Sequence, residues 1–456
     1  GCRRGCLAQT PGYEDRMGAN MRIVIGVHHF PPKYRGGAEW RAYRTASALL
    51  KAGHDVLVVC IEKIDDAQAK PLAVKEDVFE GVPLQRLAFN LAAAPDPLQW
   101  EYNNEWVGTH LLDLFDSRNT DLFHLMSGYL MTGSALMAAR QAGVPTVVTL
   151  TDFWFLCRRV SMLRTDGTLS ALPIDALRCA RCLGEEKRRF RLAARFLPDL
   201  MNRYWKAQRR NVNYFEQRWS FLRDCLVETD LAISPSKFLR QMYVDSGMVA
   251  RRMEFLRQGH SFGSLQSTDL QKSPSDFLRV GYLGQIAPLK GVQLLVDAIL
   301  QIPSRQIELH IHGDSGMHPQ YSNALSLAAR HDPRVVLHGA YERSQLTSIL
   351  RDLDVVVVPS LWYENSPNVI LEAFAHDTPV IASNFGGMAE LVDDERNGLH
   401  FAVGDAADLA KQICRISEDP SLLDRLTQGA AATHPPTVDA EIEDLLGLYH
   451  LAMHRT

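Results

Sequence analysis

The sequence lacks long apolar runs. No stretch of its 456 residues reaches the roughly 18 consecutive apolar residues that a membrane-spanning helix needs. Residues 1–20 also lack the apolar core of a secretory signal peptide, and we expect them to form a disordered leader ahead of Met21. No segment is therefore predicted to cross a bilayer.

Cysteine is scarce, and acceptor sequences for N-glycosylation are absent. Eight cysteines are spread over 456 residues, and no Asn-x-Ser/Thr sequence occurs. A chain of this length can build its core without disulfides, so both features predict a protein of the reducing cytosol.

Neither sign of charge dominates the composition. The net charge of −4 gives no global indication of nucleic-acid binding. An apolar content of 46% and a charged content of 22% are ordinary for a globular protein. At roughly 100–200 residues per domain, the length predicts two or three domains.

The stretch 354–390 organises the rest of the sequence. Its four β-branched residues Val355–Val358 predict a strand that is buried on both faces of a parallel sheet. After a loop, Ser366 is expected to cap a helix and Pro367 to be its first residue. A second apolar strand and a short helix follow, which completes the repeating unit of a doubly wound α/β sheet.

Two acids lie in that unit, Glu364 in the predicted loop and Glu372 in the predicted helix. Open α/β sheets bind ligands at the carboxyl ends of their strands, and helix starts favour phosphate. Carboxylates accept hydrogen bonds from hydroxyl groups, so this combination favours a nucleotide sugar as ligand. In the alternative interpretation, both acids only complement the helix dipole.

The same residues resemble the retaining GT-B-type glycosyltransferases of family four, the group one transferases. The Glu-x7-Glu motif of that family corresponds to Glu364 and Glu372, within PSLWYENSPNVILEAFA and PVIASNFGGMAELV. The resemblance covers nearly the whole chain from Met21. It implies an α/β fold of GT-B architecture, in which two Rossmann-like doubly wound domains face each other across a cleft.

The resemblance also implies a donor site. Lys290 would hold the donor diphosphate, Glu364 the donor sugar and Glu372 the nucleotide ribose. Gln285 replaces an arginine that is frequent in the family. Thr151 replaces a histidine, so the contact with the acceptor would come from Asp152, a neighbouring residue or the backbone. The implied catalytic residues are Glu364, Lys290 and Asp152, and the implied donor-binding residues are Gly36, Gly37, Gly284, Gln285, Lys290, Tyr341, Asn365, Ser366, Asn368 and Glu372. Without the resemblance, the paired glycines also fit a tight turn, and Lys290 fits an ordinary surface lysine.

Three cysteines raise the question of a metal. Cys179 and Cys182 have the Cys-x2-Cys spacing of zinc sites, and Cys157 precedes them. Ser170 stands where relatives of this subgroup tend to have a fourth cysteine. Three thiolates do not close a tetrahedral site, so no metal is expected, and zinc at these cysteines is the alternative.

Residues 178–223 are basic and rich in aromatic residues, with thirteen Lys or Arg against four acids. A basic amphipathic helix with aromatic residues is typical of a membrane-surface binder. It also fits an acidic, diphosphate-linked lipid acceptor, or a solvated helical face. Nucleic acid is not expected, because no binding motif accompanies the charge.

The predicted domain organisation has five parts. They are a leader (1–20), an acceptor-side Rossmann-like domain with the basic insertion 178–223 (21–263), a linker (264–276), a nucleotide-sugar-binding Rossmann-like domain (277–432) and a C-terminal helix that crosses back to the first domain (433–456).

The resemblance thus implies transfer of a sugar from a nucleoside-diphosphate sugar to an acceptor hydroxyl, with retention of anomeric configuration and no required metal cofactor. The expected setting is cell-surface polysaccharide or glycolipid synthesis in the cytoplasm, with possible attachment to the inner face of the membrane. The expected partners are the donor, a glycan or lipid-linked acceptor, and an anionic membrane surface through 178–223. The alternatives are a nucleotide-sugar epimerase and a scaffold that binds nucleotide sugar without chemistry.

Overall fold

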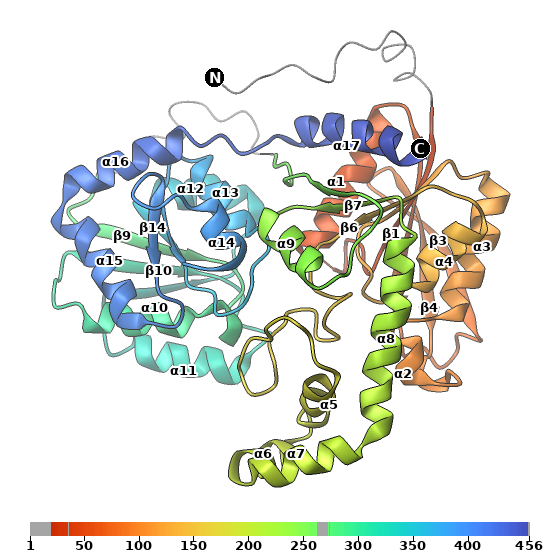
Figure 1. Ribbon diagram of the computed structural model, residues 1–456. Coiled ribbons are helices and arrows are strands. Elements are labelled where there is room, and N and C mark those ends of the chain that lie inside the picture. The colour runs from red at the N-terminus through yellow and green to blue at the C-terminus, as the bar shows by residue number, and fades with distance from the viewer. Residues whose placement is uncertain (1–19, 35, 262–271, 273, 455–456) are drawn as a thin grey trace. The chain divides into compact units, whose positions relative to one another are not determined.

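A computed structural model of the chain describes residues 20–34, 36–261, 272 and 274–454 (Figure 1). Residues 1–19 of the predicted leader (1–20) and most of the predicted linker (264–276) lie outside these residues, and both stay predictions. The described residues group into two compact units. The first is drawn from 1–149, 224–231 and 446–456, and the second from 150–223 and 232–445.

The first of two sheets has eight strands. Its order is β3 (Leu72–Phe79), β4 (Val82–Phe89), β2 (Asp55–Lys63), β1 (Arg22–Val27), β5 (Leu122–Leu125), β6 (Thr146–Thr149), β7 (Leu231–Ser234) and β8 (Met253–Phe255). β3 is antiparallel to β4, whereas β4, β2, β1, β5 and β6 run parallel to one another. β7 and β8 also pair in parallel, at the far edge of this sheet.

The second sheet has six strands, all parallel. Its order is β11 (Val335–Gly339), β10 (Ile307–His312), β9 (Leu278–Leu283), β12 (Val355–Val358), β13 (Val380–Ser383) and β14 (Gly398–Phe401). The two sheets confirm the predicted α/β class with two doubly wound parallel-dominated sheets.

Helices connect the strands. Those before β7 are α1 (Gly37–Lys51), α2 (Pro97–Trp100), α3 (Glu105–Arg118), α4 (Ser134–Gln141), α5 (Ala176–Gly184), α6 (Arg188–Phe196), α7 (Pro198–Ala207) and α8 (Arg209–Val227). Those after β7 are α9 (Lys237–Asp245), α10 (Val292–Gln301), α11 (Pro319–Ala329), α12 (Leu346–Arg351), α13 (Asn368–Phe374), α14 (Gly386–Leu391), α15 (Ala406–Glu418), α16 (Pro420–Ala431) and α17 (Val438–Met453). Short 3₁₀ turns lie at Leu91–Ala93, Pro288–Lys290 and Arg343–Gln345.

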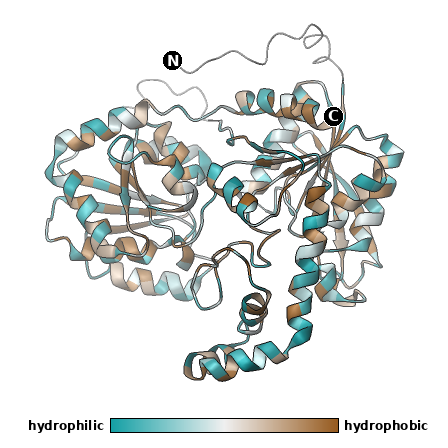
Figure 2. Ribbon diagram, in the orientation of Figure 1, coloured by the Kyte–Doolittle hydropathy of each residue, from teal (hydrophilic) through white to brown (hydrophobic). Residues whose placement is uncertain are grey.

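Strand β12 is buried on both faces, as its run of valines predicts. Val355 and Val357 belong to one apolar cluster with α10 and α15, while Val356 and Val358 belong to a second cluster with α13 and α14. Successive side chains of a strand point to opposite faces, so a continuous apolar run fits a sheet that is covered on both sides. Figure 2 shows the apolar colouring of these central strands.

Ion pairs fasten the amino end of the six-stranded sheet. Arg279 at the start of β9 donates to Asp354, the residue before β12, with a nitrogen–oxygen distance of 2.7 Å. Arg334, just before β11, pairs with Asp332 at 2.7 Å and donates to three backbone carbonyls. These contacts lie at the edge opposite to the one where ligands bind in such sheets.

The C-terminal helix α17 is tied to strand β5 by a buried histidine. His124 is 1% exposed, and its ring hydrogen-bonds the hydroxyl of Tyr449 from α17 at 2.7 Å and that of Thr149 at 2.7 Å. Burial lowers the pKa of His124 to about 3, and the nearby Arg41 acts in the same direction. The folded protein therefore holds this histidine neutral.

Among the described residues, no helix is long and apolar enough to cross a membrane.

His124 should make stability depend on pH. Its pKa is depressed in the folded state, so the unfolded chain binds an extra proton between about pH 6.5 and about pH 3. Lowering the pH within that window should then reduce the free energy of unfolding by about 1.4 kcal/mol per pH unit. Urea unfolding of wild type and of His124→Asn between about pH 6 and about pH 4.5 measures this slope. We expect a shallower dependence in the variant; equal slopes would contradict the assignment.

Candidate functional site

The winding of the six-stranded sheet reverses between β9 and β12. The strands appear in the order 3-2-1-4-5-6 when numbered along this half of the chain, and β9 and β12 are hydrogen-bonded neighbours. In doubly wound sheets, the carboxyl edge at such a reversal is the position where ligands bind. The sequence motifs around Lys290 and Glu364 follow β9 and β12 respectively.

Gly291 lets the two loops approach each other closely. Its φ is +71°, a left-handed conformation, and a Cβ placed on it would lie 2.0 Å from the carbonyl oxygen of Pro359. The backbone N–H of Leu361 donates to the carbonyl of Leu289 at 2.8 Å. Glycine is required here on both counts, and it sets the position of Lys290.

Glu364 collects three hydrogen bonds on one carboxylate oxygen. Its side chain is 10% exposed, and its Oε1 accepts from Lys290 Nζ (2.5 Å), Trp362 Nε1 (2.8 Å) and Ser360 Oγ (2.9 Å). Within the described part of the chain, Glu364 Oε2 takes no hydrogen bond. The predicted convergence of Lys290 and Glu364 is thus present, with a second oxygen left to accept.

Backbone and side-chain hydrogen bonds to neighbouring segments hold the loop that carries Glu364. Gly387 donates its N–H to the carbonyl of Glu364 at 2.8 Å, and a Cβ on Gly387 would lie 1.7 Å from the carbonyl oxygen of Asn365. The side chain of Asn365 accepts from Ser236 Oγ and donates to the carbonyl of Thr151 at 3.1 Å. Asn365, predicted as a donor-binding residue, has its amide engaged by the protein.

The start of the helix after Glu364 differs from its prediction. α13 begins at Asn368, with Pro367 as the capping residue and no side-chain capping bond, so the prediction of Ser366 as N-cap is wrong. Ser366 Oγ is instead buried without a hydrogen-bond partner among the described residues. Pro367 has a ψ of 117°, an extended value, so the prediction of Pro367 as the first helical residue is also wrong and the helix begins one residue later.

Glu372 pairs with an arginine that the sequence had not singled out. Its Oε1 accepts from Arg343 Nη1 at 3.1 Å, and its side chain is 8% exposed. Tyr341 precedes this arginine, and burial, together with the charge of Glu372, raises the pKa of its hydroxyl to about 12. Arg343 lies two residues after Tyr341, in the loop that follows β11. Its place after the carboxyl end of a predicted strand could have indicated it as a site residue.

The glycine-rich entry to Lys290 is also ordered. Gly284 has a φ of +148°, and its N–H donates to the carbonyl of His312 at 3.0 Å. Gln285 donates its side-chain amide to Met317 Sδ at 2.6 Å, and its carbonyl accepts from Tyr282. Gln285 brings no charge, so Lys290 is the cation of this loop.

Asp152 lies in the turn after β6. Its Oδ1 accepts from the backbone N–H of Trp154 at 2.7 Å, and its Oδ2 accepts from Thr151 Oγ1 at 3.2 Å. Its carbonyl accepts from Tyr243. The carboxylate predicted to contact the acceptor therefore also shapes its own turn.

Gly36 and Gly37 belong to the first unit and open α1. Gly36 is the capping residue of that helix, with an ordinary extended backbone. Beside it, His28 Nε2 lies 3.3 Å from Glu39 Oε1. Burial alone would raise the pKa of Glu39, but the hydrogen bond with His28 holds it below its usual value. His28 follows β1, and neither residue was predicted.

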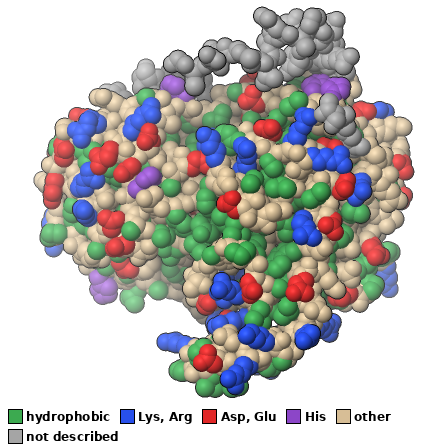
Figure 3. Space-filling model, in the orientation of Figure 1, with side chains coloured by type: hydrophobic (Ala, Val, Ile, Leu, Met, Phe, Trp, Pro, Cys, Tyr) green, Lys and Arg blue, Asp and Glu red, His purple; other side chains and the backbone are tan. Residues whose placement is uncertain are grey.

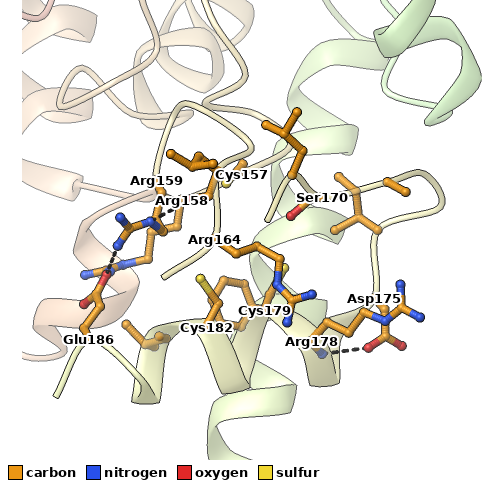
Figure 4. Close-up of a pocket in the computed structure, with 16 residues that line it drawn as sticks. Cys157, Arg158, Arg159, Arg164, Ser170, Asp175, Arg178, Cys179, Cys182 and Glu186 are labelled. Carbon is orange, nitrogen blue, oxygen red and sulfur yellow. Dashed lines mark hydrogen bonds and ion pairs between the residues drawn. The ribbon is translucent and has the colours of Figure 1, made fainter. Parts of the chain in front are cut away.

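The three cysteines of the possible zinc site line one cavity of about 100 Å³ (Figure 4). Helix α5 contributes Cys179 and Cys182, and the segment after β6 contributes Cys157, with four arginines around them: Arg158, Arg159, Arg164 and Arg178. Among the described residues, no group of three or more His, Cys, Asp or Glu side chains could hold a metal ion. The zinc alternative has no support from this geometry.

The predicted basic helical insertion 178–223 is covered by four helices, α5 to α8. Gly184 ends α5, and Pro198 begins α7. Arg218 of α8 is buried and donates to the carbonyls of Trp154 and Phe155. The segment is therefore anchored through α8 to the turn that holds Asp152.

Two family models match most of the chain. Residues 278–419 match "Glycosyl transferases group 1", and residues 36–259 match "Glycosyl transferase 4-like domain". The chain belongs to the group 1 glycosyltransferases, and its fold is GT-B.

The chain is similar to curated glycosyltransferases over different lengths of sequence. The chain is 32% identical to a D-inositol 3-phosphate glycosyltransferase of Stackebrandtia nassauensis over 195 residues, which cover 40% of this chain and 43% of the relative. It is 27% identical to the alpha-D-kanosaminyltransferase of Streptomyces kanamyceticus, over 37% of this chain and 44% of the relative. The match therefore spans less than half of each of these two proteins. Glycogen synthase of Mycobacterium tuberculosis matches at 23% identity over 90% of this chain and 89% of its own.

Solved structures share the fold at low sequence identity. Anabaena Alr3699/HepE, solved in complex with UDP, superposes with a TM-score of 0.63 at 17% identity, over 94% of this chain and all of its own. A glycosyltransferase from Rickettsia africae gives 0.65 at 15% identity, over 96% of this chain and 100% of its own.

Gly291→Ala should destabilise the protein more than the same substitution at a left-handed glycine with open space around it. Gly247 has a φ of +74° with nothing near its missing Cβ, so Gly247→Ala should cost about 1 kcal/mol of backbone strain. Gly291→Ala adds the clash with Pro359, and we expect a cost of about 3 kcal/mol or more. Urea unfolding of the two variants measures the difference. Equal costs would show that the loops do not meet as described.

Cys179 should be a slow nucleophile. Burial and the two neighbouring thiols raise the pKa of Cys179 to about 12, which leaves little thiolate near neutral pH. We expect iodoacetamide to modify Cys179 at least about a hundredfold more slowly than glutathione at about pH 8. Peptide mass spectrometry measures this rate, and the urea-unfolded chain is the control. Equal rates in the folded and unfolded chain would contradict the partly buried position and the raised pKa of Cys179.

Proposed function

We propose that the chain transfers a sugar from a nucleoside-diphosphate sugar to an acceptor hydroxyl, with retention of the anomeric configuration. The observation that carries this proposal is the Lys290–Glu364 ion pair where the winding of the sheet reverses. Doubly wound sheets bind nucleotides at that position. Membership of the group 1 glycosyltransferases supports the reaction class, and the Anabaena structures with UDP and with UDP-glucose support this type of donor.

Lys290 has the position and charge to stabilise the leaving group. When the sugar leaves, negative charge develops on the diphosphate, and a cation held in advance lowers the barrier. The Lys290 side chain is 26% exposed and is held by Glu364, so it can reach a ligand without first becoming ordered. This fixed charge lets the reaction proceed without a required divalent metal.

Glu364 and Glu372 would recognise hydroxyl groups. Three donors occupy Glu364 Oε1, and Oε2 would accept from a hydroxyl of the donor sugar. Glu372, held by Arg343, would accept from the ribose, with Tyr341 beside the base. Ser366 Oγ, which is buried without a partner in the described chain, would complete its hydrogen bonding with the same ligand. Gly36, Gly37 and Asn368 stay predicted donor contacts.

The acceptor would approach the turn after β6. Asp152 lies there, and Asn365 joins this turn to the loop of Glu364 through the carbonyl of Thr151. The acceptor would be a glycan or a lipid-linked glycan in cell-surface polysaccharide or glycolipid synthesis. All six cysteines of the described chain are free thiols, which supports a cytoplasmic location for that reaction.

A thermal-shift screen against uridine, guanosine, adenosine and thymidine diphosphate sugars tests the donor class. A ligand that binds only the folded state raises the apparent stability in proportion to its affinity. Release of nucleoside diphosphate with acceptor, and NMR of the product anomer, then test transfer and retention. Isomerised donor without acceptor would indicate an epimerase instead. Tight binding with no release across an acceptor panel would indicate a scaffold.

Lys290→Ala and Glu372→Ala should each lower turnover and donor affinity. Loss of a charged hydrogen-bonding group costs about 1.5–3 kcal/mol, so we expect kcat/KM to fall by about tenfold to a hundredfold. Initial rates and titration calorimetry with the donor measure both effects.

Two matched variants serve as controls. Lys411→Ala removes an exposed lysine from α15, and Asp354→Asn weakens an ion pair at the opposite edge of the sheet. Both should keep donor affinity, whatever they do to stability. Wild-type kinetics in Lys290→Ala or Glu372→Ala would refute the assigned roles.

A further inference from the structure

The corner between α6 and α7 presents a strongly basic surface. Residues 188–207 contain six cations and one acid, Asp199. All six cations are exposed, and they lie on both helices: Arg188, Arg189, Arg191, Arg195, Arg203 and Lys206. Figure 3 shows Lys and Arg side chains gathered with hydrophobic ones at the lower end of the view, where Figure 1 places these helices.

The same corner exposes large apolar side chains. Phe196 is 74% exposed, Leu200 59%, Leu197 54% and Leu192 47%. Leu192 and Phe196 are one helical turn apart on α6, and Leu197 and Leu200 continue the surface into the first turn of α7. We name these four residues the apolar corner.

The four residues of the apolar corner do not belong to the core that packs α6 and α7 together. α6 and α7 already have a core on their other side, made of Ala194, Met201 and Trp205, with Phe190 against it. That core is tight, because a Cβ on Gly184 of α5 would lie 1.9 Å from the Trp205 ring. The helices are thus held by α5, and the apolar corner has no role in holding them.

We infer that the apolar corner and its arginines dock this protein on an anionic lipid bilayer. Four apolar side chains at a bend suit insertion at the level of the headgroups and the first acyl carbons, while the surrounding arginines pair with lipid phosphates. This charge complementarity distinguishes a bilayer from an apolar protein partner. A nucleic acid would match the arginines and leave the four apolar side chains in water, so the bilayer accounts for more of the surface.

The inference does not rest on the proposed sugar transfer. None of the residues in the apolar corner belongs to the donor site, so vesicle binding and activity can be measured independently. Docking through surface side chains of this kind would be peripheral and reversible.

Sedimentation of the full-length protein with vesicles tests the inference. We expect binding to vesicles of equal phosphatidylcholine and phosphatidylglycerol, little binding to phosphatidylcholine alone, and release by concentrated NaCl. Hydrogen exchange should slow in 188–207 when anionic vesicles are added. Equal binding to both vesicle types, or protection that appears elsewhere in the chain, would overturn the inference.

Matched double variants locate the contact. Phe196→Ser with Leu200→Ser should lower the partition coefficient at least about tenfold, whereas Val78→Ser with Leu327→Ser, which are similarly exposed, should not. Arg195→Gln with Arg203→Gln should lower it about tenfold or more, and Arg330→Gln with Lys411→Gln should leave it unchanged. All four should keep wild-type melting temperatures, because each side chain is exposed.

Three outcomes would reject the bilayer. The first is wild-type vesicle binding by the Phe196 and Leu200 variant, and the second is tighter binding to a DNA duplex than to anionic vesicles. The third is a wild-type dimer that becomes a monomer in this variant, when neither form binds vesicles. Sedimentation velocity and fluorescence anisotropy provide the last two measurements.

Discussion

The ion pair between Lys290 and Glu364 is the contact on which the site depends. It joins loops 74 residues apart, and it is largely removed from water. Desolvation makes such a pair costly unless further hydrogen bonds complete it, and Ser360 and Trp362 supply them. Neither loop can shift alone without leaving a charge unpaired in a poorly solvated place. The carboxyl edge is therefore prearranged before any ligand arrives, with one carboxylate oxygen still able to accept.

The sequence predicted the parts of this site that depend on local chemistry. The run Val355–Val358 indicated a doubly covered strand, and the spacing of Glu364 and Glu372 placed one acid in a loop and the other in a helix. It did not predict Arg343 or the engagement of Asn365 by Ser236, because both contacts join segments that are far apart along the chain. Donors within a few residues of Glu364 were readable in principle, since Ser360 and Trp362 stand beside it in the motif.

The region between β6 and β7 shows where composition misleads. Its charge and aromatic content indicated a basic helical surface, yet Arg218 of α8 is buried and donates to backbone carbonyls instead of facing a surface. Counting cations could not separate those that face water from one that is fully buried. The Cys-x2-Cys spacing indicated a zinc alternative, and the fold brings Cys179, Cys182 and Cys157 to the lining of one small cavity.

The amino and carboxyl ends of the strands form two rims of the six-stranded sheet, and different ion pairs lie at each rim. Arg279 pairs with Asp354 and Arg334 with Asp332 at the amino rim, while the Lys290–Glu364 ion pair of the proposed donor site lies at the carboxyl rim. The strands between them are rigid and densely packed, so substitutions at one rim need not disturb the other. Substitutions at the amino rim can thus change the heat resistance of this half of the molecule and leave the proposed donor site at the opposite rim unchanged.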